Sequence, residues 1–285
     1  MKIKISLVFF MTILFINNTN AQNKEAKKNV EKISLSEALE IAINQKTLCQ
    51  RMAKDKLYIE ARRNKTKADR ELDRTINAFN EGIERLKTFS PTEEIKLKIA
   101  VQEYTFETYR TTILKTSKKS MYKIVKTNTL FLNICNDLVK EFSAYSRSIN
   151  PNLNSREIYA RQQIDNFTKI SGTISYNTQR LALYYSLKSF EITEVDDRRI
   201  IAIINKISSD IKTLTISEFN TLEIDDALSE LVYYWSKLKS QILNKERKLI
   251  ETTEDFAEIE LFEATNTVLD KANEMIRLYS KLNDI

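Results

Sequence analysis

Glycine and proline are almost missing from this chain, and their scarcity constrains its fold more than any other feature. The sequence of 285 residues contains two glycines and two prolines. Tight β-turns depend on glycine for positive φ angles and on proline for a fixed φ, so a fold built of short strands needs many more of both. The sequence therefore predicts an all-α protein.

Capping patterns mark the starts of several helices, because a Ser, Thr or Asn followed three positions later by an acidic residue is typical of a helix N-terminus. Five such starts are Ser34 with Glu37, Ser90 with Glu93 (Pro91 then being the first helical residue), Asn154 with Glu157, Thr193 with Asp196, and Asn220 with Glu223. Pro151, within SINPNLNS, breaks the helical pattern near the middle of the chain. The expected helices span residues 34–63, 67–89, 92–116, 119–149, 155–190, 195–216, 221–246 and 251–283.

The two halves of the chain resemble each other at a fixed spacing of 129 positions. The matches include Gln50 with Gln179, Arg51 with Arg180, Ala53 with Ala182, Glu94-Ile95 with Glu223-Ile224, Tyr104 with Tyr233, Phe106 with Trp235, and Ile113-Leu114 with Ile242-Leu243. At a spacing of 137, Asn136-Asp137-Leu138-Val139 matches Asn273-Glu274-Met275-Ile276. One register held over several helices predicts an internal duplication that gives two tandem four-helix bundles.

Apolar residues lie on more than one side of the first helix. One stripe contains Leu39, Ala42 and Cys49 and is interrupted by Lys46, and a second contains Leu48 and Met52. A helix that is apolar on two sides is packed on two sides, so we expect the first and fifth helices to be internal and in contact. The aromatic residues that recur at one helix position are expected in the core, and they are Tyr104, Phe106, Tyr233, Tyr234 and Trp235.

The repeated helix resembles the first helix of the PilJ-type N-terminal sensor domain of type IV pilus methyl-accepting chemotaxis transducers. It is also similar to the periplasmic domain of nitrate/nitrite sensor kinases. The family form I-N-x-A-G-x-x-R-M-L-S-Q-R-M-A corresponds to IAINQKTLCQRMAKDKL in the first copy and to KISGTISYNTQRLALYY in the second. The resemblance spans nearly the whole chain after its first residues, twice over, and implies periplasmic four-helix bundles that perceive a small ligand or a partner protein.

The resemblance also implies a site, with two departures. In the nitrate sensors an arginine of the paired first helices holds the anion, and its position is occupied here by Lys46 in the first copy and Ser175 in the second. This change argues against nitrate as the ligand, because a lysine lacks the two-pronged guanidinium of arginine. The relatives continue into a transmembrane helix and signalling domains, which this sequence does not include, so signalling is expected to need an envelope or membrane protein partner.

The candidate ligand-binding residues are the matched polar positions of the two repeated helices. They are Lys46, Gln50, Arg51, Ser175, Gln179 and Arg180. The arginines and glutamines could donate charge-assisted hydrogen bonds to a small anion or carboxylate shared between the bundles. The alternative interpretation is that each arginine pairs with an acidic residue and joins two helices, and that Lys46 extends its ammonium to solvent.

The first residues of the chain have the pattern of a secretory signal peptide. Lys2 and Lys4 precede an apolar run over residues 5–16, and small or polar residues follow before Gln22. An uncleaved anchor is the alternative, although twelve apolar residues are few for a bilayer span. The predicted organisation is a signal peptide over residues 1–21, a basic leader over 22–33, and bundles over 34–150 and 151–285, in an exported protein that is periplasmic or secreted.

Composition disfavours most other functions. The net charge is +6, from 45 basic and 39 acidic residues that are well interspersed, and this disfavours nucleic-acid binding. The absence of histidine removes Ser-His and Cys-His catalysis and most transition-metal sites, so we expect no enzyme, no metal and no cofactor. Cys49 and Cys135 could form a disulfide or could be two buried small residues.

These observations predict a non-enzymatic, sensor-type protein that perceives a small ligand where two bundles meet and that acts through a partner. The alternative is a structural or interaction bundle of the cell envelope without a small ligand. The two differ in whether Lys46, Arg51 and Arg180 converge on a polar cavity or each pair with a carboxylate.

Overall fold

The computed structural model describes residues 32–149, 154–192, 195–247 and 254–282, and these residues form helices and no strand. The eight α-helices are α2 (Leu35–Glu60), α3 (Lys65–Thr88), α4 (Glu93–Lys115), α5 (Met121–Ser148), α6 (Ser155–Ser189), α7 (Asp197–Thr215), α8 (Leu222–Arg247) and α9 (Glu254–Leu282). A short 3-10 helix, η1 (Lys118–Ser120), precedes α5. The all-α prediction is confirmed. The predicted signal peptide, most of the basic leader and Pro151 lie outside the described residues.

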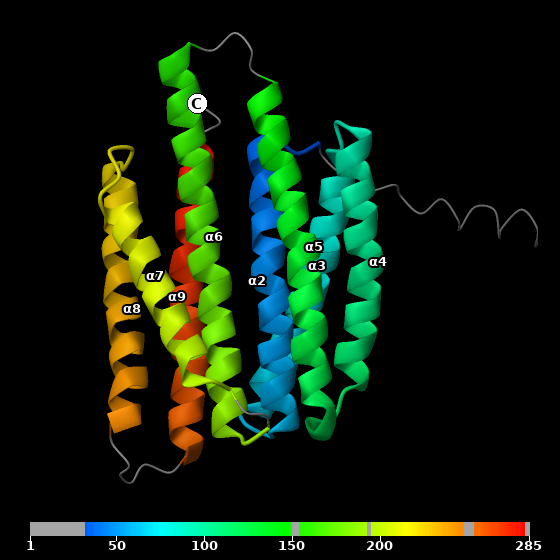
Figure 1. The fold of residues 1–285 in the computed structure, drawn as a ribbon, viewed down its shortest axis with the longest axis vertical. Coiled ribbons are helices and arrows are strands. Elements are labelled where there is room, and N and C mark those ends of the chain that lie inside the picture. Colours follow the sequence, from blue (N-terminus) through cyan, green and yellow to red (C-terminus); the bar gives the residue numbers. More distant parts are fainter. Residues whose placement is uncertain (1–31, 150–153, 193–194, 248–253, 283–285) are drawn as a thin grey trace, which may run out of the picture. The chain divides into compact units, whose positions relative to one another are not determined.

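The two halves pair their helices in the same way (Figure 1). In the first half α2 packs against α3 and α5, and α4 packs against α5. In the second half α6 packs against α7 and α9, and α8 packs against α9. The halves meet where α2 contacts α6 and α9, so the expected contact between the first and fifth helices is confirmed.

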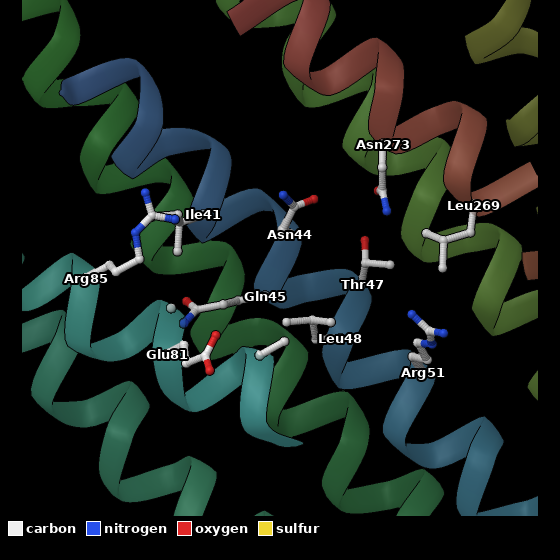
Figure 2. A pocket seen from close by; sticks show the side chains of 12 residues that line it. Ile41, Asn44, Gln45, Thr47, Leu48, Arg51, Glu81, Arg85, Leu269 and Asn273 are labelled. Carbon is white, nitrogen blue, oxygen red and sulfur yellow. The ribbon is translucent and has the colours of Figure 1, made fainter. Parts of the chain in front are cut away.

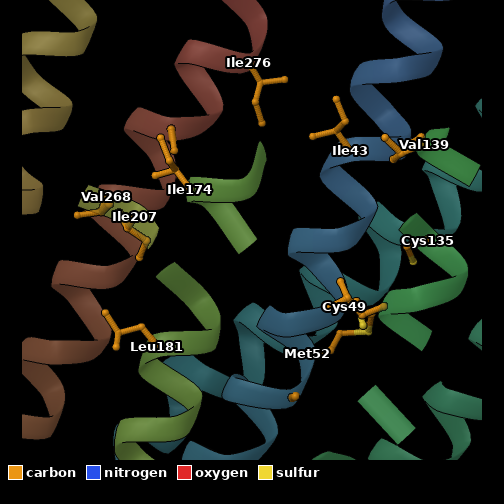
Figure 3. Close-up of a cluster of buried hydrophobic side chains, with 14 of the residues drawn as sticks. Ile43, Cys49, Met52, Cys135, Val139, Ile174, Leu181, Ile207, Val268 and Ile276 are labelled. Carbon is orange, nitrogen blue, oxygen red and sulfur yellow. The ribbon is translucent and has the colours of Figure 1, made fainter. Parts of the chain in front are cut away.

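One continuous hydrophobic core joins the halves, and the chain from Ile33 onward forms a single compact unit. Figure 3 shows part of this core, with Ile43 and Cys49 of α2, Cys135 of α5, Ile174 of α6 and Ile276 of α9. Both cysteines are buried free thiols, as the second of the two sequence interpretations holds. A core shared in this way is expected when a central helix is apolar on two sides.

Both glycines of the protein lie in helices that face α2. A Cβ atom added at Gly172 of α6 would overlap the Cγ2 atom of Ile43. A Cβ atom at Gly82 of α3 would lie 3.1 Å from Nε2 of Gln45. The missing side chains thus let α3 and α6 approach the central helix closely. Ile43 and Gly172 are themselves 129 positions apart, so matched positions of α2 and α6 touch each other.

The ends of α2 and α6 repeat one backbone motif. Arg62 and Glu191, at the same spacing of 129, both have positive φ, at 59° and 53°. The next residue in each case donates its amide to a carbonyl near the end of the helix, from Arg63 to the Tyr58 carbonyl and from Ile192 to the Leu187 carbonyl. Helices often end in this left-handed conformation, usually at glycine. The recurrence supports the predicted duplication, which stays a prediction.

Several helix starts differ from the predicted caps. Ser34 accepts the Glu37 amide and Asn154 forms a full capping box with Glu157, as expected. The cap of α4 is Thr92 rather than Ser90, so the prediction of Pro91 as the first helical residue is wrong.

Asp196 caps α7, and the Thr221 hydroxyl, rather than Asn220, accepts the Ile224 amide at the start of α8. Thr193, the predicted cap, lies outside the described residues. In each case the observed cap is the polar residue nearest the helix, whose oxygen reaches the free amides of the first turn.

One expectation about the core is also wrong. Phe106 and Trp235 are buried, but Tyr104 is 78% exposed and Tyr233 is 63% exposed. Residues two positions apart lie about 200° apart around a helix, so both cannot face the core.

Candidate functional site

The side chain of the predicted residue Lys46 extends from α2 to α6. Its Nζ atom is 4.5 Å from the centroid of the Tyr176 ring, and only 8% of the residue is exposed. Burial lowers the pKa of Lys46 to about 8. The lysine therefore contacts an aromatic face instead of extending to solvent. Ser175, its matched residue on α6, donates to Oδ1 of Asn273 on α9 at 3.0 Å.

The two matched glutamines point into their own halves. Gln50 Nε2 donates to Asn128 Oδ1 of α5 at 2.7 Å, and Gln179 Nε2 donates to the Thr265 carbonyl of α9 at 3.2 Å. Asn128 and Thr265 are 137 positions apart, which is also the spacing between the matching residues 136–139 and 273–276 in the fourth helices of the two halves, α5 and α9. Each glutamine thus joins the first helix of its half to the fourth.

The two matched arginines have different partners. Arg51 forms an ion pair with Glu71 of α3, as the alternative interpretation of the sequence holds for this residue. The Arg180 guanidinium lies 5.1 Å from the centroid of the Tyr184 ring and donates to the hydroxyl of the same tyrosine at 2.9 Å. Lys46, Arg51 and Arg180 therefore do not converge. As a ligand-binding set, the six predicted residues stay a prediction.

A cavity of about 330 Å³ lies over α2, between α3 and α9 (Figure 2). Its lining residues are Ile41, Asn44, Gln45, Thr47, Leu48 and Arg51 of α2, Ala78, Glu81, Gly82 and Arg85 of α3, and Leu269 and Asn273 of α9. Arg51 is the one member of the predicted set among them. Because α9 belongs to the second half, the cavity lies where the halves meet.

Four buried polar atoms in the wall of this cavity have no hydrogen-bond partner within the described part of the chain. They are Asn44 Oδ1, Gln45 Oε1, Thr47 Oγ1 and Arg51 Nε. Gln45 is 1% exposed and Thr47 is 3% exposed. An unsatisfied buried polar group costs on the order of 1–3 kcal/mol, so four of them around one cavity favour a polar occupant.

The threonine and glutamine atoms have defined hydrogen-bonding roles. Gln45 Nε2 donates to the Phe79 carbonyl at 3.4 Å, so the free atom of this amide is the oxygen, an acceptor. Threonine hydroxyls on other helices here, such as Thr178 and Thr265, donate to the carbonyl four residues earlier. No such bond is found for Thr47 among the described residues, so its hydroxyl can donate into the cavity.

Two charged residues of α3, Glu81 and Arg85, lie at the rim of the cavity. Glu81 is exposed and has no ion pair within the described ranges, whereas Arg85 pairs with Glu37. Asn273 accepts from Ser175 through its oxygen, and its amide nitrogen points toward Thr47 in Figure 2. The cavity thus has donors on the α9 side and acceptors on the α3 side.

Further along α2, beyond the residues that line the cavity, Lys54 and Asp55 form a buried charged pair that the sequence reasoning did not single out. Lys54 Nζ donates to Asn266 Oδ1 of α9 at 2.7 Å, lies 4.1 Å from the Phe262 ring centroid and is 3.5 Å from Asp55 Oδ1. Both residues are fully buried. Burial raises the pKa of Asp55 to about 6, against the opposing effect of Lys54 and Arg51, and lowers the pKa of Lys54 to about 8.

The sequence held a signal for both features. Asn44, Thr47 and Arg51 recur at the 3–4 spacing that puts side chains on one helix face, which is unusual on an internal helix. The run AKDK brings Lys54 and Asp55 into the same helix. Of these five residues, Arg51 alone has the same residue 129 positions later, so the internal repeat does not point to the other four.

Comparison of the chain with protein-family models, curated proteins and solved structures gave no match. The resemblance to PilJ-type domains therefore stays a prediction based on the repeated helix. Among the helices of the described residues, none combines the length and the apolar character that a membrane crossing requires.

Proposed function

We propose that this protein is an exported, non-enzymatic sensor-type protein that binds a small polar ligand in the cavity between α2, α3 and α9. The observation that carries the proposal is the cavity of about 330 Å³, in whose wall four buried polar atoms have no hydrogen-bond partner among the described residues. A cavity with an apolar lining and a few convergent polar groups is the usual form of a small-molecule site.

The position of the cavity suits a sensor. Leu269 and Asn273 come from the second half of the chain, and the other lining residues come from the first. A ligand that contacts both walls binds best at one spacing of α9 from α2 and α3, so it favours that arrangement over others. The changed arrangement is the signal that a partner in the envelope or membrane would recognise.

A thermal-shift screen of the purified protein tests this function. The panel contains small anions, carboxylates, amines, zwitterions and sugars. A ligand at a hundred times its Kd adds about 2.7 kcal/mol to the free energy of unfolding, which is a clear rise in Tm. Ala78→Trp, at the exposed rim, should fill the cavity and abolish the shift. Asn80→Trp, on the exposed side of the same helix, is the matched control and should retain it.

One observation favours the interaction bundle as a second candidate. Leu97, Val101 and Tyr104 are exposed on α4 at a spacing of four and three residues, so they form one apolar stripe on its surface. The cavity is not the site if no ligand class raises the Tm of the protein. The same conclusion follows if a ligand raises the Tm of the Ala78→Trp variant as much as it raises that of the wild type. The stripe on α4 then becomes the leading candidate, with a protein partner.

A further inference from the structure

We propose that the cavity takes a linear zwitterion whose ammonium and carboxylate groups are separated by a short apolar chain. This inference rests on the proposed function and names the class of its ligand. It depends on how donors and acceptors are divided between the two ends of the cavity.

The end next to α9 offers donors. Within the part of the chain that the structure describes, the buried Thr47 hydroxyl and the buried Arg51 Nε–H have no hydrogen-bond partner, and the amide nitrogen of Asn273 points toward Thr47. The Arg51 charge is shared with Glu71 and with Asp55, whose Oδ2 atom lies 3.9 Å from Nε, but Nε donates no hydrogen bond within the described residues. Several donors that include a guanidinium are a typical arrangement for binding a carboxylate.

The end next to α3 offers acceptors. The Gln45 oxygen is buried and has no partner in the described ranges, and Glu81 lines the same cavity next to Gly82, the glycine that faces the Gln45 side chain. Arg85 lies at the same end, but its guanidinium pairs with Glu37. A carboxylate with a neighbouring amide oxygen suits an ammonium group, which has three donors and no acceptor.

Apolar side chains separate the two ends. Gln45 and Thr47 leave α2 on opposite sides because they are two positions apart. Leu48 lies between them in Figure 2, and Ile41, Ala78 and Leu269 complete the apolar lining. A ligand with both charges on one carbon cannot reach both ends at once. A ligand with its charges at the two ends of a methylene chain can.

The Asn44 amide can present either a donor or an acceptor to the cavity. No hydrogen bond from the described residues fixes which end of its amide faces the cavity, and amide oxygen and nitrogen atoms are interchangeable by a flip. The division into a donor end and an acceptor end therefore depends on Thr47, Arg51 and Asn273 against Gln45 and Glu81.

Isothermal titration calorimetry with the purified protein tests the proposal. The probes are the ω-amino acids glycine, 4-aminobutyrate and 6-aminohexanoate, together with hexanoate and hexylamine. We expect affinity to rise with the length of the spacer. We also expect 6-aminohexanoate to bind about tenfold or more tightly than either probe with one charge, since each charged end adds hydrogen bonds to an ionised group.

Two nearly isosteric variants separate the two ends. Glu81→Gln should remove the preference for 6-aminohexanoate over hexanoate, and Thr47→Val should reduce its preference over hexylamine. Glu84→Gln, one turn along α3 and outside the cavity, is the control for Glu81→Gln and should bind as the wild type does. The Tm of each variant without ligand confirms that it is folded.

The outcomes distinguish this inference from the proposed function. If hexanoate binds as tightly as 6-aminohexanoate, or if glycine binds as tightly as the longer probes, the separated zwitterion is wrong although the cavity still binds a small ligand. If none of these probes binds but another class raises the Tm in a way that Ala78→Trp abolishes, the zwitterion is again wrong. If no class binds, both proposals fail.

Discussion

Helices α2 and α6 begin the two halves and share their Gln-Arg pair, but α2 buries four charged residues at positions where α6 has uncharged ones, and α6 buries a single charged residue, Asp165, at another position. Four matched positions differ in this way: Lys46 and Ser175, Lys54 and Leu183, Asp55 and Tyr184, and Lys56 and Tyr185. The contacts that define the helix position, such as the glutamine bond to the fourth helix, are present in both. The buried charges of α2 are therefore not required to form a helix in this position, and they belong to what distinguishes the first half.

The largest expected effect comes from giving α2 the residue of α6 at one charged position. Lys54→Leu, which introduces the residue found at Leu183, leaves the Asp55 carboxylate buried without its neighbouring ammonium. Removing one partner of a buried ion pair costs about 3–5 kcal/mol. We expect a loss of this size in the free energy of unfolding, measured by chemical denaturation at pH 7.

A second variant decides whether the pair or the packing matters. Lys54→Leu combined with Asp55→Leu removes both charges, and such replacements are often neutral or stabilising. The double variant should regain most of the stability lost by the single one. A double variant as unstable as Lys54→Leu would show that the Lys54 bond to Asn266 and its packing on Phe262, rather than the charge of Asp55, are what α2 needs here.

A smaller effect should appear in the pH dependence of stability. Burial raises the pKa of Asp55 to about 6 in the folded protein, above its unfolded value of about 3.9. The folded state therefore binds this proton more tightly, so the carboxyl group stabilises the fold below pH 4 relative to pH 7, and this contribution is lost as the pH rises through 6. Between pH 4 and 7 the loss is about 2 kcal/mol.

Asp55→Asn isolates this contribution, because the other carboxylates titrate equally in both proteins. The difference in unfolding free energy between wild type and variant should change by about 2 kcal/mol between pH 4 and 7, with the wild type relatively weaker at pH 7. Tyr184→Phe, at the matched position of α6, is the control and should show no change in this range. A constant difference for Asp55→Asn would mean that the pKa of Asp55 in the folded protein does not differ from its unfolded value.

The fold could be predicted closely from the sequence because its signals are local. The helix ranges agree within a few residues, since Pro151, the polar clusters and the apolar periodicity each act within a few positions. The caps were less well predicted where two polar residues compete, as at Ser90 and Thr92. A difference of one or two residues in the cap changes few contacts, so the sequence pattern discriminates weakly between such neighbours.

The candidate site could be predicted only in part, because it depends on which face of α2 meets which helix. Arg51 was singled out, but its orientation toward α3 and α9 follows from packing. Gln45 and Thr47 are ordinary polar residues in the sequence. They become notable only when burial leaves their oxygens unpartnered beside a cavity. Asn273 comes from the far end of the chain, and no local pattern connects it to Thr47.

The smallest expected effect concerns the contact between matched positions of α2 and α6. Gly172→Ala adds a Cβ that overlaps Cγ2 of Ile43, whereas Gly82→Ala meets the end of the flexible Gln45 side chain. Both changes gain about 1 kcal/mol of helix propensity, but overpacking costs about 1–3 kcal/mol. Gly172→Ala should therefore lose up to about 2 kcal/mol in unfolding free energy, and Gly82→Ala should be neutral or slightly stabilising.

Ile43→Ala removes the atom that Gly172→Ala meets, so a double-mutant cycle in chemical denaturation tests the cause. In the Ile43→Ala background Gly172→Ala should no longer destabilise, and the two changes should couple by about 1–3 kcal/mol, which is the overpacking cost that Ile43→Ala relieves. Additive effects would mean that the strain arises elsewhere on α6, and the close approach of α2 and α6 at Ile43 would not depend on the glycine. Coupling would identify Gly172 as the residue that lets α2 and α6 pack closely at matched positions. This close packing would then be independent of the buried charges in which the two helices differ.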